Sequence, residues 1–88
     1  MNITYLENTL TAQQYLYMER CMCEVITTLA QAERAIAHQL YSVSAYDGET
    51  LVGIARLVGD GAIYWYIQDV WVLPSYQRQG IGSDLCVL

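Results

Sequence analysis

The sequence predicts an α/β domain in the order strand, two helices, three antiparallel strands, a glycine loop and the start of a last helix. Three observations predict it. Short β-branched and aromatic segments have the period of strands. Two Thr-X-X-Gln sequences open segments with helical spacing, and Asp-Gly pairs mark tight turns between the later strands. The 88 residues have room for one small domain, residues 1–88, with a single core.

The first half of the chain predicts one strand and two helices. Residues 2–7 alternate apolar and polar side chains, as a strand does. Thr11-Ala12-Gln13-Gln14 has the form of a capping box and predicts a helix from that point; residues 28–31 predict a second. Around residues 26 and 27 the sequence does not define a sharp boundary between the two helices. The second helix is expected to have one apolar face, made by Leu29, Ala32, Ile36 and Leu40.

The second half predicts three strands joined by tight turns. Residues 41–46 and 50–58 flank Asp47-Gly48, a pair typical of hairpins. Gly59-Asp60-Gly61 then leads into a long strand that starts at residue 62 and ends before Pro74, which cannot donate to a ladder. Strict alternation of this strand predicts a largely buried surface with four side chains on one side: Ile63, Trp65, Ile67 and Trp71. An ion pair between Arg56 and Asp60 is expected across the turn.

Composition excludes several classes of protein. Nine acids against four arginines and no lysine give a net charge of −5, which argues against nucleic-acid binding and would attract a cationic amine. An odd number of cysteines and the lack of a secretory signal argue against a disulfide framework and predict a cytoplasmic protein. No apolar run has the roughly 20 residues of a membrane span. The 55% hydrophobic content hints at a further buried surface, such as a dimer interface.

The glycine loop carries the strongest chemical signal. Gln77-Arg78-Gln79-Gly80-Ile81-Gly82 lies between the long strand and the last helix, and such a loop gathers free N–H groups around one point, where a phosphate binds. A dinucleotide fingerprint would need a third small residue at Leu85, and a Walker loop would need a lysine. The alternative is a plain strand-to-helix turn without a ligand.

This loop resembles the Gln/Arg-X-X-Gly-X-Gly/Ala motif of the GNAT family of N-acetyltransferases. Residues 69–76 are similar to the strand exit that precedes it, and the resemblance extends over the whole chain. It implies a partial GNAT-like fold, because family members continue past this helix into further strands while the sequence stops at Leu88. We therefore expect either a fragment, or a homodimer in which a second copy covers the open sheet edge.

The resemblance implies transfer of an acetyl group from acetyl-CoA to a primary amine of a small molecule or peptide. The N–H of Val72 would donate to the thioester carbonyl, where negative charge develops. Family loops often have glycine at the position of Arg78 and a basic residue at that of Gln79, so the positive charge is displaced by one residue here. The residues expected to bind the co-substrate are Val70, Trp71, Val72, Gln77, Arg78, Gln79, Gly80, Ile81, Gly82 and Ser83.

A general base must take the proton of the attacking amine. Asp69 is the one ionisable acid on the long strand and is the first candidate, with Tyr66 and Gln68 as groups that orient water; the alternative for Asp69 is a structural hydrogen-bonding role. The Cys21-Met22-Cys23 segment lacks a second ligand pair, so no metal site is expected. The alternative function is a catalytically silent, truncated module that binds CoA or only dimerises through its sheet edge.

Overall fold

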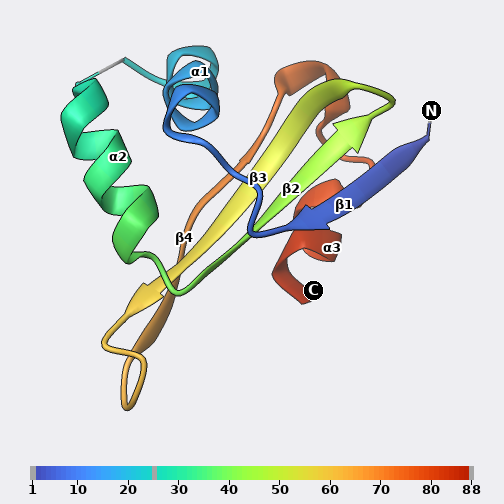
Figure 1. The fold of residues 1–88 in the computed structure, drawn as a ribbon. Coiled ribbons are helices and arrows are strands. Elements are labelled where there is room, and N and C mark those ends of the chain that lie inside the picture. Colours follow the sequence, from blue (N-terminus) through green and yellow to red (C-terminus); the bar gives the residue numbers. More distant parts are fainter. Residues whose placement is uncertain (1, 25, 88) are drawn as a thin grey trace.

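The computed structural model describes residues 2–24 and 26–87, and its elements follow the predicted order (Figure 1). The fold is α/β, with the predicted succession of one strand, two helices, three further strands, a loop and a last helix. Its elements are β1 (Ile3–Glu7), α1 (Ala12–Met22), α2 (Leu29–His38), β2 (Tyr41–Asp47), β3 (Thr50–Gly59), β4 (Trp65–Val72), a 3-10 turn (Pro74–Tyr76) and α3 (Ile81–Val87).

All four strands form one antiparallel sheet in the order β1-β2-β3-β4. Helices α1 and α2 lie on one face and α3 on the other (Figure 1). Ile54 packs with Met18 and Ala32 on the α1/α2 face, and Val52 packs with Leu85 on the α3 face. Strand β4 is therefore at an edge of the sheet, with one side of its backbone unpaired by the described strands.

Local sequence signals set the helix starts. The Thr11 side chain accepts from the Gln14 N–H at 3.1 Å, and the Thr11 N–H donates back to the Gln14 side chain at 3.0 Å. Thr28 and Gln31 repeat this arrangement at α2, so both predicted capping boxes are confirmed. Among the described residues, no helix has the length and apolar character needed to cross a membrane.

The α3 helix lies close against β3 because Gly53 lacks a side chain. A Cβ atom at Gly53 would come within 3.2 Å of the Trp71 carbonyl oxygen and 3.3 Å of Leu85 Cδ1. These distances are shorter than ordinary van der Waals contacts. Gly53 thus fixes how near the start of α3, and the loop before it, come to the end of β4.

Three details differ from the sequence prediction. Helix α2 ends at His38, so Leu40 lies beyond it, and both Leu29 and Leu40 are partly exposed. Strand β4 begins at Trp65 rather than at residue 62. Asp60 does not pair with Arg56: its Oδ1 accepts from the N–H groups of residues 62, 63 and 64 at 2.8, 2.8 and 3.1 Å. These hydrogen bonds, the first from Ala62, lower the pKa of Asp60.

The largest difference concerns β4. Trp71 packs against Tyr15 on the α1/α2 face, with ring centroids 5.3 Å apart, whereas Ile67 lies on the opposite face beside Val43 and Leu85. The prediction that Ile67 and Trp71 share a side was wrong, because a bulge interrupts the register between Ile54 and Arg56 of β3. One extra residue in β4 moves all later side chains to the other face.

Candidate functional site

The loop between β4 and α3 holds two residues in the left-handed backbone region. Gly80 has φ +83°, with open space where a Cβ would stand. Arg78 has φ +65°, a conformation that costs an L-residue with a Cβ roughly 1–2 kcal/mol. Backbone turns of this kind direct neighbouring N–H groups toward one point, so the loop has the geometry of an anion-binding concavity.

The N–H groups at the end of this loop are not consumed by the protein's own carbonyls. The first hydrogen bond of α3 runs from the Asp84 N–H to the Gly80 carbonyl at 3.0 Å. The three N–H groups that precede it have no partner within the helix. Within residues 2–24 and 26–87, no hydrogen bond is donated by the backbone N–H of Gln79, Gly80, Ile81, Gly82 or Ser83.

A cleft of about 240 Å³ lies beside the loop. Its walls come from the last turn of α1, the end of β4, the 3-10 turn, the loop and the first turn of α3. Five of the predicted binding residues line it, namely Val70, Val72, Gln77, Arg78 and Gly82, together with two that the sequence did not suggest, Met22 and Tyr76. The structure thus brings the end of β4 and the loop to one cavity.

The other predicted binding residues do not present side chains to this cleft. Trp71 packs against Tyr15, and the Ile81 side chain is buried under the sheet at 2% exposure. Only the main-chain groups of these two residues are available to a ligand in the cleft. A ligand in the cleft would therefore meet backbone N–H groups and small side chains at the loop, with Arg78 as the one cation among the lining residues.

The N–H and C=O groups of Val72 point away from β3, toward the open edge of the sheet. The Leu73 N–H donates to the Val52 carbonyl at 2.8 Å, and Val72 stands opposite Gly53. Because N–H and C=O groups alternate in direction along an antiparallel strand, those of Val72 face away from β3. The Val72 carbonyl accepts from Gln77 Nε2 at 3.0 Å, so Gln77 ties the loop to the strand and leaves the Val72 N–H beside the cleft.

The bulge in β4 is held by an ion pair between a buried arginine and a partly buried aspartate. Asp69 has φ +55° and its Oδ2 accepts from Arg56 Nη1 at 2.7 Å. Arg56 Nε also donates to the Gln39 side chain at 2.9 Å, and the guanidinium lies 5.1 Å from the centre of the Tyr15 ring. Arg56 of β3 thus binds Asp69 of β4 and is itself held by Gln39, the residue directly after α2.

Tyr15 completes this cluster. Its hydroxyl donates to Asp69 Oδ2 at 3.3 Å. Burial, together with the nearby Asp69 charge, raises the pKa of Tyr15 to about 12. The hydroxyl therefore remains protonated, and remains a donor, throughout the physiological range. The sequence analysis did not suggest Tyr15 for this role.

Asp69 does not line the cleft, and its carboxylate accepts hydrogen bonds from Arg56 and Tyr15. These are the contacts of the structural alternative given for this residue. Its action as a general base stays a prediction, as do the water-orienting roles of Tyr66 and Gln68. Among the described residues, no group of three or more His, Cys, Asp or Glu side chains is arranged to hold a metal ion.

Tyr76 connects the site to the rest of the sheet. It stands in the 3-10 turn directly before the loop, and its hydroxyl donates to Asp47 Oδ2 at 2.7 Å. The cleft is thereby anchored to the β2–β3 hairpin at Tyr76 and to the edge of β4 at Gln77. Its shape is set by the folded sheet rather than by the loop alone.

Comparisons with known proteins agree with this geometry. A family model described as the Acetyltransferase (GNAT) family matches residues 6–86. The chain is similar to an acetyltransferase of the GNAT family from Streptococcus pneumoniae, SP0256, with 38% identity and a TM-score of 0.86 over 98% of this chain and 64% of that one. A search of curated proteins gave no match.

Two other solved structures are also similar. One is a protein of unknown function from meticillin-resistant Staphylococcus aureus, SA2161, titled a probable acetyltransferase, with 29% identity and a TM-score of 0.87 over 98% of this chain and 65% of that one. The other is a putative GNAT acetyltransferase from Xanthomonas campestris, with 26% identity and a TM-score of 0.74 over 99% and 63%. The chain spans about 64% of the length of these structures. With a family match over residues 6–86 and the loop geometry in agreement, the chain belongs to the GNAT family of acetyltransferases.

Proposed function

We propose that this chain binds acetyl-CoA in the cleft between β4 and the glycine loop and transfers the acetyl group to a primary amine. One observation carries the proposal: five loop N–H groups without acceptors among the described residues stand beside a cleft whose other wall is the outward-facing edge at Val72. The family to which the chain belongs supports the same chemistry.

The loop would hold the pyrophosphate of the co-substrate. Main-chain N–H groups of residues 79–83 are suited to phosphate oxygens because they carry partial positive charge and cost no side-chain entropy to order. Arg78 adds a full positive charge at the rim of the cleft. Gly82 leaves room for the phosphate because it has no side chain.

The β4 edge would hold the pantetheine arm and the thioester. The arm contains amide groups, and these pair with an unpaired strand edge as a peptide does. The Val72 N–H is then the donor nearest the thioester carbonyl, where charge develops when the amine attacks. Loss of one such donor typically costs about 3 kcal/mol of transition-state stabilisation. Asp69, or a water held near Tyr66 or Gln68, would accept the proton of the amine.

A catalytically silent module is the second candidate. The observation that favours it is the engagement of Asp69 with Arg56 and Tyr15, which leaves the cleft without a lining carboxylate among the described residues. Such a module would keep the loop and bind CoA without turnover. The two candidates agree on binding and differ on chemistry.

Two measurements separate them. The first is thermal unfolding with 0 to 5 mM acetyl-CoA, where a ligand at 100 times its Kd adds about 2.7 kcal/mol of stability; the matched control is Gly82→Val. The second is release of free CoA thiol in the presence of a panel of primary amines. Stabilisation with thiol release supports the acetyltransferase, and stabilisation alone supports the silent module. A folded protein that millimolar acetyl-CoA does not stabilise would contradict both binding candidates and leave only a module that dimerises through its sheet edge.

A further inference from the structure

The loop at residues 77–83 lies between two hydrogen bonds of the same kind. Directly before the loop, the Tyr76 hydroxyl donates to Asp47 Oδ2 at 2.7 Å. Directly after it, Asp84 Oδ2 accepts from the Tyr5 hydroxyl at 2.9 Å. Each bond joins a tyrosine to a carboxylate from a distant part of the chain. The loop is therefore tied at both of its ends to other segments of the fold.

Both bonds lead to β1 and β2, on the side of the sheet away from β4. Asp47 is the last residue of β2 and stands opposite Ile3 of β1. Tyr5 lies in β1, opposite Ala45 of β2. In the sheet order β1-β2-β3-β4, these are the two strands that do not pair with β4. The loop is thus held between β4, from which it leaves, and two strands across the sheet.

Backbone strain explains why the loop needs this support. Arg78 has φ +65°, and an L-residue with a Cβ keeps such a conformation only where its surroundings hold it there. Gln77 donates to the Val72 carbonyl, which is a contact within the same stretch of chain. Among the described residues, the two tyrosine–aspartate bonds are the only hydrogen bonds that join residues 74–87 to residues more than five positions away.

We propose that these two pairs position the loop for the diphosphate of acetyl-CoA, so that Asp47 and Tyr5 act as positioning residues of a cleft that neither of them lines. The inference rests on the proposed function and extends the site to β1 and β2. The N–H groups of residues 79–83 bind one anion together only while they converge. A loop that holds this conformation for part of the time binds more weakly, in proportion to that fraction.

Tyr5 also controls the acid closest in sequence to the loop N–H groups. Asp84 follows Ser83 directly and lies in the first turn of α3, where a carboxylate is attracted to free N–H groups. Its Oδ2 instead accepts from Tyr5, and no described backbone N–H donates to its carboxylate. Without the Tyr5 hydroxyl, this carboxylate would compete with the diphosphate for the same donors.

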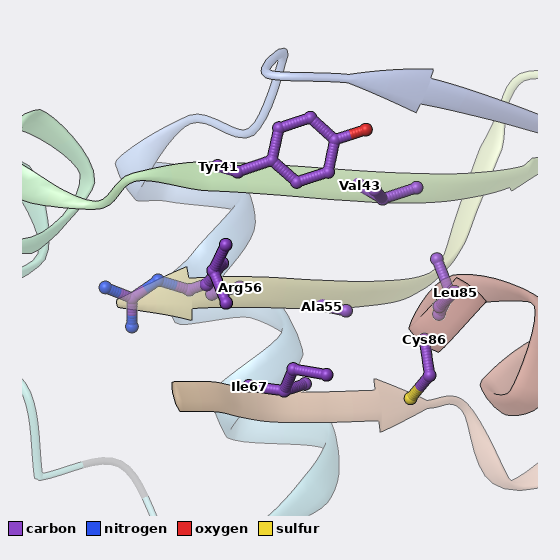
Figure 2. Close-up of a pocket in the computed structure, with 8 residues that line it drawn as sticks. Tyr41, Val43, Ala55, Arg56, Ile67, Leu85 and Cys86 are labelled. Atoms are coloured by element: carbon purple, nitrogen blue, oxygen red, sulfur yellow. The ribbon is translucent and has the colours of Figure 1, made fainter. Parts of the chain in front are cut away.

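A third pair of the same kind, away from the loop, provides the matched control. The Tyr41 hydroxyl donates to Glu7 Oε1 at 2.6 Å, and the rings of Tyr5, Tyr41 and Tyr76 all pack against the buried residues of the α3 face. Figure 2 shows Tyr41 on β2 beside a groove of about 190 Å³, with Leu85 of α3 at the other end. Tyr41→Phe therefore removes a comparable bond without releasing the loop.

The test is isothermal titration calorimetry with three ligands. Tyr76→Phe, Tyr5→Phe and Asp47→Ala should each weaken acetyl-CoA binding roughly three- to tenfold, and Tyr41→Phe should not. Inorganic pyrophosphate, added as a competitor of acetyl-CoA, should lose affinity by the same factor. S-acetylpantetheine lacks the diphosphate, so it should bind these variants as it binds the native protein. A general loss of structure would weaken all three ligands.

Two further comparisons show whether each pair acts as a unit. Tyr76→Phe combined with Asp47→Ala should bind acetyl-CoA no more weakly than the weaker single variant, because both changes remove the same bond. Asp47→Asn keeps an acceptor oxygen for Tyr76 and should regain most of the affinity lost in Asp47→Ala. Asp84→Asn should raise the affinity more in Tyr5→Phe than in the native protein, since the carboxylate competes only when it is released.

The outcomes separate this inference from the proposed function. A native protein that does not bind acetyl-CoA would overturn both. Native binding that Tyr5→Phe, Tyr76→Phe and Asp47→Ala leave unchanged would overturn the positioning role alone. Equal losses for acetyl-CoA and S-acetylpantetheine, or an equal loss in Tyr41→Phe, would overturn it as well, because the hydrogen bonds would then support the fold in general rather than the loop.

Discussion

The two halves of β4 belong to one strand and pair with the same neighbour, but their surroundings differ. Residues 65–68 expose aromatic and aliphatic side chains. Beyond Asp69, Trp71 is partly buried under α1, and Val72 is buried under α3 at 8% exposure with its N–H beside a cleft. One half is apolar and exposed, and the other borders a cleft.

The boundary between the halves is one residue. Asp69 takes the extra position of the bulge at φ +55°, and the Arg56 guanidinium and the Tyr15 hydroxyl both donate to its carboxylate. Bulges commonly redirect side chains next to functional sites. The division of β4 is therefore produced by contacts from α1 and β3, rather than by the composition of β4 itself.

The largest expected effect comes from removing the cation that holds the bulge. Arg56 is 8% exposed, and Arg56→Met leaves the Asp69 carboxylate without its partner, which for buried pairs costs about 3–5 kcal/mol. Since Asp69 is partly exposed, we expect about 3 kcal/mol, measured by urea unfolding. Affinity for acetyl-CoA should fall as well, because the edge at residues 70–72 loses its fixed direction.

A double-mutant cycle is the control for this effect. Asn tolerates the left-handed region, so Asp69→Asn removes the charge without adding backbone strain. The double variant of Arg56→Met and Asp69→Asn should be more stable than Arg56→Met alone, because no unpaired charge remains. A double variant whose loss of stability equals the sum of the two single losses would show that the two side chains do not act as a pair.

A substitution in the cleft should affect the second half of β4 alone. A Cβ at Gly82 would lie 3.9 Å from Val72 Cγ2, and its backbone does not have a positive φ. Gly82→Val therefore fills the cleft without straining the chain, and we expect acetyl-CoA affinity to fall at least 100-fold, about 2.7 kcal/mol, in isothermal titration calorimetry.

Gly80 and Gly48 give a matched pair for the same question. Both have positive φ, +83° and +62°, and open space for a side chain, so Gly80→Ala and Gly48→Ala should cost similar stability. Only Gly80→Ala should weaken acetyl-CoA binding, since Gly48 lies in the hairpin turn between β2 and β3. Equal affinity in both variants, together with wild-type affinity in Gly82→Val, would show that the loop is not the site.

Local sequence signals predicted much of this fold because they act over a few residues. The capping boxes at Thr11 and Thr28 were found as predicted, and so was the turn at Asp47-Gly48 between β2 and β3. The strand-loop-helix context of the glycine motif was confirmed, with Gly80 in the conformation that favours glycine. The capping boxes depend on residues three positions apart, and the loop motif on six consecutive residues.

The errors came from contacts between residues far apart in the chain. Trp65 and Trp71 read as one face of one strand, but the bulge at Asp69 places Trp71 on the other face. The partner of Arg56 is Asp69, 13 positions away, rather than Asp60. An aspartate inside an apolar strand was the available signal, since Asp is one of the few residues that tolerate a positive φ.

Replacing Arg78 in the loop by glycine should raise the stability of the protein and weaken acetyl-CoA binding, both by smaller amounts than the changes above. Arg78 has φ +65°, so Arg78→Gly should raise the free energy of unfolding by about 1 kcal/mol. Loss of its charge at the rim should weaken acetyl-CoA about three- to tenfold. Arg78→Ala keeps the strain and loses the charge, so it should show the weaker binding alone. Similar stability of Arg78→Gly and Arg78→Ala would show that the positive φ at residue 78 does not strain the backbone.

The smallest effect concerns the pH dependence of the contacts that hold the bulge. The pKa of Tyr15 rises from 10.0 to about 12 on folding, so the folded state favours the protonated hydroxyl. Its contribution to stability is fully present below pH 10 and is lost as the pH rises from about 10 to about 12. Tyr15→Phe lacks this titration, so its free energy of unfolding should fall less steeply than that of the native protein across this window.

The comparison between the two proteins isolates Tyr15 from the other tyrosines. Tyr5, Tyr41 and Tyr76 also have raised pKa values, each through burial or a hydrogen bond to a carboxylate, and they titrate in both proteins alike. The difference in slope between pH 10 and 12 therefore reports Tyr15 alone, and urea unfolding at half-unit steps would measure it. Parallel curves would mean that the hydroxyl is not held against Asp69, and that Arg56 by itself keeps the two halves of β4 distinct.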